Sequence, residues 1–168
     1  MPRSRQWTIA LASAVLPMAL IPLTSPSALA HSAAADYPVY TYAIKVTSTD
    51  STVVLYNKQL ASCSAGVGGT CSLSRSFSVA RTIQTKLGVT RAIVAAEIGF
   101  STATTTTVTS QCNSPKFTKS GQVYRAYPQG IKKRYNITRK MYYNGKLENI
   151  SYSSGEAFNP QGVYCRMT

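Results

Sequence analysis

Acidic residues and histidine are scarce in this chain. It has five Asp and Glu residues against 18 Lys and Arg, and its single histidine is His31. General acid–base chemistry and nucleophile triads usually need a histidine or two carboxylates close together. The sequence therefore predicts a protein that is not an enzyme. The five acids are widely spaced: Asp36, Asp50, Glu97, Glu148 and Glu156.

Metal-ligating and phosphate-binding patterns are missing as well. The four cysteines include no Cys-x-x-Cys pair, and zinc sites usually combine such pairs or add histidines. The glycine cluster Gly66–Gly69 lies between two cysteines and matches no phosphate-binding motif. We expect no metal and no cofactor.

A long apolar run occurs only at the start of the chain. Arg3 and Arg5 precede the uncharged stretch Trp7–Leu23, and Ala28-Leu29-Ala30 offers the small residues that signal peptidase reads. We predict a secretory signal peptide over residues 1–30 and a secreted, extracellular protein. A membrane anchor is the alternative, but two prolines interrupt a run that is short for a membrane span.

Positive charge dominates the remainder. The net charge is +13, and loss of Arg3 and Arg5 with the signal peptide lowers it to +11. No acidic residue occurs between Glu97 and Glu148. Such a field attracts acidic partners: other secreted proteins, wall polymers or an anionic cell surface or membrane. Export disfavours nucleic acid, and a solubilising surface without a partner is the alternative.

The four cysteines are even in number, which predicts disulfides in an exported chain. Three pairings are possible. We favour Cys63–Cys71, which closes a small loop and leaves Cys112–Cys165 to tie the middle of the chain to its end. No free thiolate nucleophile is then expected.

Strand patterns fill the rest of the chain. The clearest alternates over Ser72–Gln84, where one parity is small and polar and the other carries Leu73, Phe77 and Val79. Lys86–Gly99 fits a strand pair or a short helix, and no amphipathic helix is convincing. We expect about eight strands: Tyr37–Thr47, Thr52–Tyr56, Ser72–Gln84, Phe100–Ser110, Gln122–Tyr127 (ended by Pro128 and Gly130), Ile131–Tyr143, Lys146–Tyr152 and Ala157–Met167.

Asn144-Gly145 lies between two of these strands and is a strong hairpin signal. The expected register places Met141 opposite Glu148 and Arg139 opposite Ile150. The predicted fold is an all-β, elongated antiparallel β-sandwich with disulfide bonds. Its expected parts are the signal peptide 1–30, an N-terminal leader and first strand 31–47, and a single β-rich domain 48–168.

The Ser/Thr-rich strands within Ser72–Tyr143 look like the pore-forming module of the aerolysin and epsilon-toxin group. In that family an amphipathic hairpin leaves the soluble body and joins a transmembrane barrel. This resemblance implies a twisted aerolysin-like sheet and, as an alternative function, a β-pore-forming protein.

In size and export route the whole chain is similar to the small adaptor subunits of secreted, umbrella-type bacterial toxin particles. This resemblance implies a non-catalytic accessory subunit of an extracellular toxin or antibacterial complex, working in a hetero-oligomer. The expected interfaces are an N-terminal strand that adds to a partner and a basic patch that docks an acidic cleft. The residues are Tyr37, Val39, Tyr40 and Tyr42 for the strand, and Lys132, Lys133, Arg134 and Tyr135 for the patch.

A third hypothesis is an exported protease inhibitor that presents the constrained loop between Cys63 and Cys71. This loop has no basic or large aromatic residue for a specificity pocket. The inhibitor therefore ranks below the adaptor and the pore former.

Overall fold

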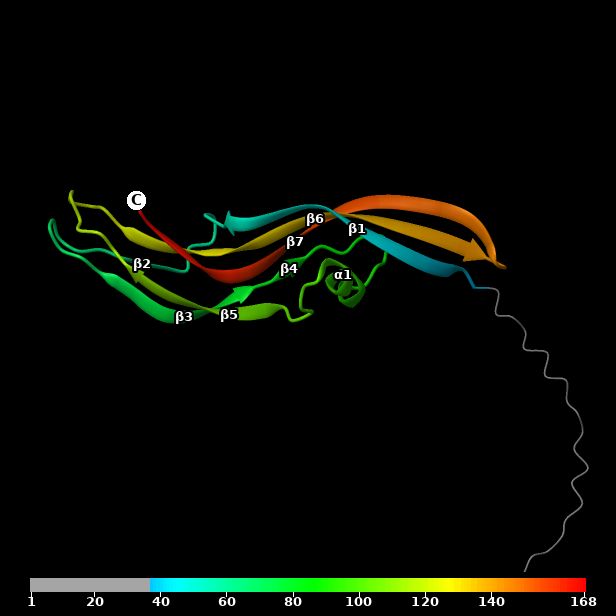
Figure 1. Cartoon of the computed structure of the whole chain (residues 1–168), viewed down its shortest axis with the longest axis horizontal. Coiled ribbons are helices and arrows are strands. Elements are labelled where there is room, and N and C mark those ends of the chain that lie inside the picture. The colour runs from blue at the N-terminus through cyan, green and yellow to red at the C-terminus, as the bar shows by residue number, and fades with distance from the viewer. Residues whose placement is uncertain (1–36) are drawn as a thin grey trace, which may run out of the picture. The chain divides into compact units, whose positions relative to one another are not determined.

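The computed structural model describes residues 37–168. The predicted signal peptide and His31 lie outside the described residues. The described part consists of antiparallel sheets with one short helix, as the all-β prediction requires (Figure 1). Its elements are β1 Val39–Val54, β2 Ala61–Cys63, β3 Ser72–Ala80, β4 Thr82–Ile83, α1 Arg91–Ile98, β5 Thr105–Asn113, β6 Tyr124–Tyr143 and β7 Lys146–Met167.

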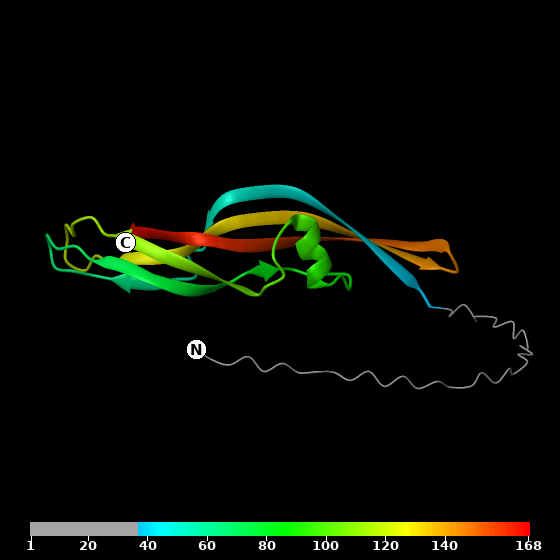
Figure 2. The ribbon, with the colours of Figure 1, turned by 60° about the horizontal axis from the view of Figure 1, so that its bottom comes forward.

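The two longest strands lie at the centre of the large sheet. β6 and β7 make a hairpin, flanked by β1 and β4 in the order β1-β6-β7-β4, and β2 also pairs with β6. β3 and β5 form a separate two-stranded sheet. In Figure 1 that sheet and α1 lie below the long strands, and the turned view of Figure 2 brings α1 to the front of them.

Residues 37–168 contain seven strands, and three pairs of strands expected as separate are continuous. β1 joins most of the expected strands Tyr37–Thr47 and Thr52–Tyr56 and crosses the boundary expected after Thr47. β7 likewise joins the two expected C-terminal strands. β-bulges absorb the interruptions in β1, with register shifts after Val46 and after Asp50.

β6 continues through Pro128 and Gly130, where the sequence predicted an end. Proline cannot donate to a ladder, but Pro128 lies where the neighbour of β6 changes: β1 pairs as far as Gln129, and β2 pairs from Ala126. At Gly130 a Cβ would lie 2.1 Å from the carbonyl oxygen of Asn159, so only glycine fits this approach of β6 to β7.

The expected long strand Ser72–Gln84 is broken at Arg81, where the chain passes from the small sheet to the large one. Arg81 Nε donates to Asn159 Oδ1 at 2.6 Å, and Nη1 donates to the carbonyl of Ala103 at 3.0 Å. The alternation itself is confirmed, because Leu73 and Val79 are buried while the serines between them are exposed. The predicted strand Phe100–Ser110 begins later, at Thr105.

For Lys86–Gly99 the sequence left two alternatives, a strand pair or a short helix, and the structure has the short helix, α1. Thr90 caps α1 by accepting from the backbone N–H of Ile93, and Gly99 ends it in a left-handed conformation. The helix buries Val94, Ala95 and Ile98.

Two hydrophobic clusters hold the layers together. The first joins α1 to the long strands through Val94, Ile98, Tyr135 and Ile137. The second joins the small sheet to the large one through Leu73, Phe117, Tyr124 and Ala126. In β6 the residues facing the clusters change from even positions (Tyr124, Ala126) to odd positions (Tyr135, Ile137). Opposite faces of the strand therefore contact the two clusters.

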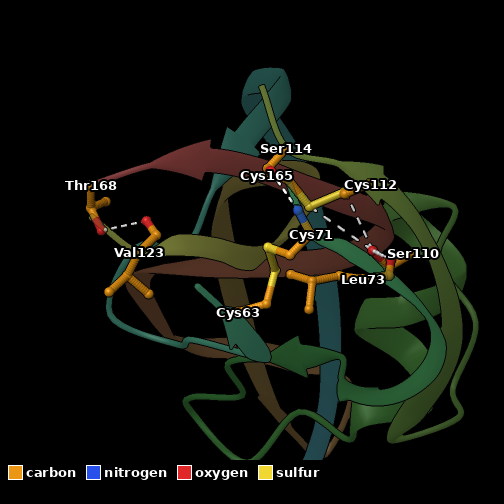
Figure 3. Close-up of a disulfide and its surroundings, with 9 residues drawn as sticks. All are labelled: Cys63, Cys71, Leu73, Ser110, Cys112, Ser114, Val123, Cys165 and Thr168. Carbon is orange, nitrogen blue, oxygen red and sulfur yellow. Dashed lines mark hydrogen bonds between the residues drawn. A yellow bond between two sulfur atoms is a disulfide. The ribbon is translucent and has the colours of Figure 1, made fainter. Parts of the chain in front are cut away.

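Both disulfides of the favoured pairing are present. Cys63 bonds to Cys71, and Cys112 bonds to Cys165, fastening β5 to β7 (Figure 3). All four cysteines pack against the second cluster. The Ser110 hydroxyl beside them donates to the carbonyl of Leu73 at 2.9 Å and so joins β3 to β5.

Candidate functional site

β1 is an edge strand of the large sheet. From Val39 to Val46 its pairing with β6 has no register shift, and this segment carries one charged side chain, Lys45. Natural edge strands are usually blunted by charges, prolines or bulges. The first half of β1 is therefore an edge to which another strand can add.

The four residues predicted for the N-terminal interface are divided by the strand. Tyr37 precedes β1 and is exposed, and Val39 and Tyr40 are exposed on opposite faces of it. Tyr42 is partly buried, and its hydroxyl donates to the carbonyl of Leu87 at 3.2 Å. Three of the four are thus accessible to a partner, while Tyr42 fastens β1 to the segment before α1.

The β6–β7 hairpin adds exposed apolar side chains beside Val39. Val39 on β1 pairs with Tyr142 on β6, which pairs with Leu147 on β7. On the same face of the sheet, the β7 residues of the next two rows are Ile150 and Tyr152. We call Val39, Leu147, Ile150 and Tyr152 the hairpin face; their exposed fractions run from 39% to 74%. The last three are not among the residues predicted from the sequence, although the Asn-Gly turn indicated the strand pairing that brings them together.

The hairpin turn is confirmed, but its register differs from the prediction. Asn144 and Gly145 both have positive φ, and Tyr143 pairs with Lys146 as expected. A shift between Met141 and Tyr142 then places Met141 opposite Asn149 and Arg139 opposite Ser151, one residue from the predicted partners. The bulge leaves Glu148 out of the pairing.

On the other face of the hairpin, Arg139 holds the start of β1. Its guanidinium lies 5.2 Å from the ring centroid of Tyr40, and its Nη1 donates to the carbonyl of Leu87 at 3.3 Å. Tyr40 is thus oriented by a cation–π contact while remaining exposed.

The four residues of the predicted basic patch do not share one surface. Successive residues of a strand point to opposite faces, so Lys132 and Arg134 lie on one face and Lys133 and Tyr135 on the other. Lys133 Nζ donates to the carbonyl of Ile98 at the end of α1, at 2.7 Å, and lies over the Phe100 ring. Tyr135 is fully buried.

Lys132 and Arg134 form a small ion-pair network. Glu156 accepts from Lys132 Nζ at 2.8 Å and from Arg134 Nε at 3.1 Å, and Arg134 Nη1 reaches Asp50 Oδ2 at 3.2 Å. The hydrogen bond from Lys132, together with that from Arg134, lowers the pKa of the Glu156 carboxyl. Much of the charge of the predicted patch is therefore neutralised within the chain.

Burial raises the pKa of the Tyr135 hydroxyl, which donates to the carbonyl of Gln84. This hydroxyl lies in the contact between β6 and the segment after β4, so it joins two elements of the fold.

A groove of about 430 Å³ opens near that segment. Its lining holds one carboxylate, the ion-paired Glu156.

Glu97, the acid with the most apolar sequence neighbours, is exposed on α1. Within residues 37–168, no group of three or more His, Cys, Asp or Glu residues is placed to hold a metal ion. No helix in this part of the chain is long and apolar enough to cross a membrane.

Comparison with known proteins adds no relative. No family model matches the chain, and a search of curated proteins finds no significant match.

Proposed function

We propose that this protein is a secreted, non-catalytic binding protein that acts as an adaptor or accessory subunit of an extracellular bacterial toxin or antibacterial complex. The observation that carries the proposal is the open edge of β1 between Val39 and Val46, next to the exposed hairpin face. A partner strand would extend the sheet at this edge with its side chains beside Val39. Ile150 and Tyr152 lie two strands further in, on β7, so a second part of the partner would cover them.

The charge of the chain favours an acidic partner. The described residues include 16 Lys and Arg but four Asp and Glu, and two of those four, Asp50 and Glu156, are already ion-paired. Lys45 and Lys140 border the hairpin face and are exposed. Opposite charge on the partner would steer association and select the register.

The disulfides support an extracellular address. Two bridges and no free cysteine among the described residues suit an oxidising compartment. The predicted signal peptide supplies the route. N-terminal sequencing of the secreted protein should give a start near His31; a retained Met1 would contradict export by this signal.

Native mass spectrometry of the tagged chain, recovered from the medium of the producing bacterium, tests the adaptor function. We expect a hetero-complex that Val39→Glu and Ile150→Glu each abolish, because they place charge on the hairpin face. Val67→Glu is the matched control: Val67 is 66% exposed in the disulfide loop, far along the chain from β1. A wild-type chain found only as a free monomer would refute the proposal.

A pore-forming protein is the second candidate, and one observation favours it. Ser74, Ser76 and Ser78 pair with Gln111, Thr109 and Thr107, which gives the two-stranded β3–β5 sheet one exposed hydroxyl-rich face. In a transmembrane barrel this face would line the lumen.

Two features weigh against the pore. Arg75 lies on the opposite face, the one with Leu73, Phe77 and Val79, where a charge at mid-membrane costs about 2–4 kcal/mol. The Cys112–Cys165 bridge also fastens the end of β5 to β7. Dye release from liposomes would favour the pore, above all if it required reduction of that bridge; retention of dye with and without reductant favours the adaptor.

A further inference from the structure

Two arginines are paired near the open end of the β6–β7 hairpin, where Cys165 bonds β7 to β5; Arg125 is partly exposed and Arg166 is exposed. Arg125 on β6 is the register partner of Arg166 on β7. Both alternate with residues of the second hydrophobic cluster, Ala126 and Cys165, so they lie on the opposite face of the ribbon from that cluster. Side chains paired in this way have Cβ atoms about 4.5–5.5 Å apart, and like charges so placed repel each other.

No counter-ion within the described chain compensates this pair. All ion pairs among residues 37–168 involve Lys132 or Arg134. Arg125 Nε is buried and has no hydrogen-bond partner among the described residues. A buried donor left unpaired is costly, so the site has one unused hydrogen-bond donor and two uncompensated charges.

A cluster of three tyrosines lies beside the arginine pair, and one of its rings contacts Arg166. Tyr127 and Tyr164 are register partners in the row next to the arginine pair, and Tyr56 packs edge-on against both, with centroids 5.3 and 6.2 Å away. The Arg166 guanidinium lies 5.2 Å from the Tyr56 centroid. The segment that carries Tyr56 is itself fixed, because Leu55 N–H donates to the carbonyl of Pro128 at 3.0 Å.

We propose that Arg125, Arg166, Tyr56 and Tyr164 form an anchor site for carboxylate side chains of an acidic protein partner, separate from β1. A guanidinium presents a planar fork of donors that matches a carboxylate. Arginine and tyrosine are also the residue types that most often dominate protein interfaces. That the partner is an acidic protein rests on the proposed function. That the site binds carboxylates does not depend on it.

Titration of the purified mature chain with a short oligoglutamate peptide tests the site, with binding followed by calorimetry. Arginine Nε–Hε signals in NMR provide the local readout. The Arg125 and Arg166 signals should move most, because these two guanidinium groups gain the carboxylate. Arg125→Gln and Arg166→Gln should each weaken binding by about 10-fold or more, as expected for a hydrogen bond to a charged group.

Arg75→Gln is the matched control. Arg75 also lies over an aromatic ring, that of Phe77 at 4.9 Å, but its register partner is Ser110 instead of a second arginine. An equal loss of affinity in this variant would show that the peptide is held by the overall positive charge of the chain and not by this site, which would overturn the proposal. Absence of binding, or heparin binding far more tightly than oligoglutamate at this site, would also overturn it.

Arg166→Glu separates the site from the stability of the fold. It places a carboxylate opposite Arg125, so we expect the Tm to rise while oligoglutamate binding is lost. Val39→Glu should leave oligoglutamate binding unchanged. The two experiments therefore test the arginine site and the β1 interface separately, and either proposal can be refuted without refuting the other.

Discussion

Tyr135 and Gly155 are register partners on β6 and β7, and a Cβ built on Gly155 would lie 2.6 Å from Cε2 of the Tyr135 ring. The ring therefore covers the backbone of Gly155. Because Tyr135 is fully buried within the first hydrophobic cluster, it has little room to move aside.

Gly155→Ala should therefore destabilise the fold. Overpacking of a filled core usually costs about 1–3 kcal/mol. Gly162→Ala is the control on the same strand, because its Cβ would meet no atom within 4 Å and its φ is not in the left-handed region. Urea unfolding of both variants checks the prediction; equal midpoints would show that the ring yields.

Tyr135→Phe should cost about 0.5–1.5 kcal/mol, because it removes the hydrogen bond from the Tyr135 hydroxyl to the carbonyl of Gln84. The raised pKa gives the wild type a pH dependence. The neutral hydroxyl is favoured by folding, so its contribution is complete below the unfolded pKa near 10 and is lost as pH rises through the higher folded pKa. Tyr135→Phe should remove this part of the alkaline loss of stability, which thermal unfolding at alkaline pH measures.

Glu156 should contribute to acid sensitivity. Its pKa is lowered by Lys132 first and Arg134 next. The contribution is therefore present above the unfolded value of 4.5 and is lost as pH falls through the folded pKa. Both cations and Glu156 are partly exposed, so each pair should contribute at most about 1 kcal/mol.

Chemical unfolding of wild type and Glu156→Gln at neutral and acidic pH tests this. The variant should lose less stability on acidification than the wild type does. Glu97→Gln, on the exposed side of α1, should behave as the wild type. Identical pH profiles for Glu156→Gln and wild type would show that the pairs contribute nothing.

The periodicity of the sequence predicted the strands and one face of each, because alternation is a local property. The fate of Pro128 was not predictable in this way, since it depends on β1 and β2 meeting β6 on either side of it. The bulge opposite Met141 likewise arises from pairing and not from one strand's own pattern.

Other errors were avoidable. Four consecutive residues in a predicted strand, Lys132 to Tyr135, must alternate between faces, so they could not form one patch. Thr90 and Gly99 also lie where a helix cap and a helix terminator belong, and these signals favoured the helix over a strand pair. The arginine pair was hidden because Arg125 and Arg166 are distant in sequence and meet only through the register.

The two disulfides should contribute unequally to stability. In the chain-entropy account, a bridge over 53 residues restricts the unfolded chain by about 4 kcal/mol and one over 8 residues by about 2.5 kcal/mol. Cys112→Ala/Cys165→Ala should therefore unfold at lower urea concentration than Cys63→Ala/Cys71→Ala. The reverse order would show that packing at the second cluster, which contains all four cysteines, outweighs loop length.

The open edge of β1 can be tested at its backbone with two neighbouring substitutions, Tyr40→Pro and Thr41→Pro, and Tyr40→Ala controls for loss of the tyrosine ring. Backbone N–H groups of successive residues in an edge strand point alternately toward the paired strand and toward solvent. One proline therefore removes a ladder bond to β6 and lowers stability by about 1 kcal/mol or more, while the other leaves the ladder intact.

The variant that keeps the wild-type Tm should still lose the secreted hetero-complex in native mass spectrometry, because it removes a donor that a partner strand needs. Thr107→Pro, in the exposed row of β5, is the control for a proline on an edge away from β1. If both β1 variants retain the complex, the partner does not pair with this edge, and the hairpin face alone must account for binding.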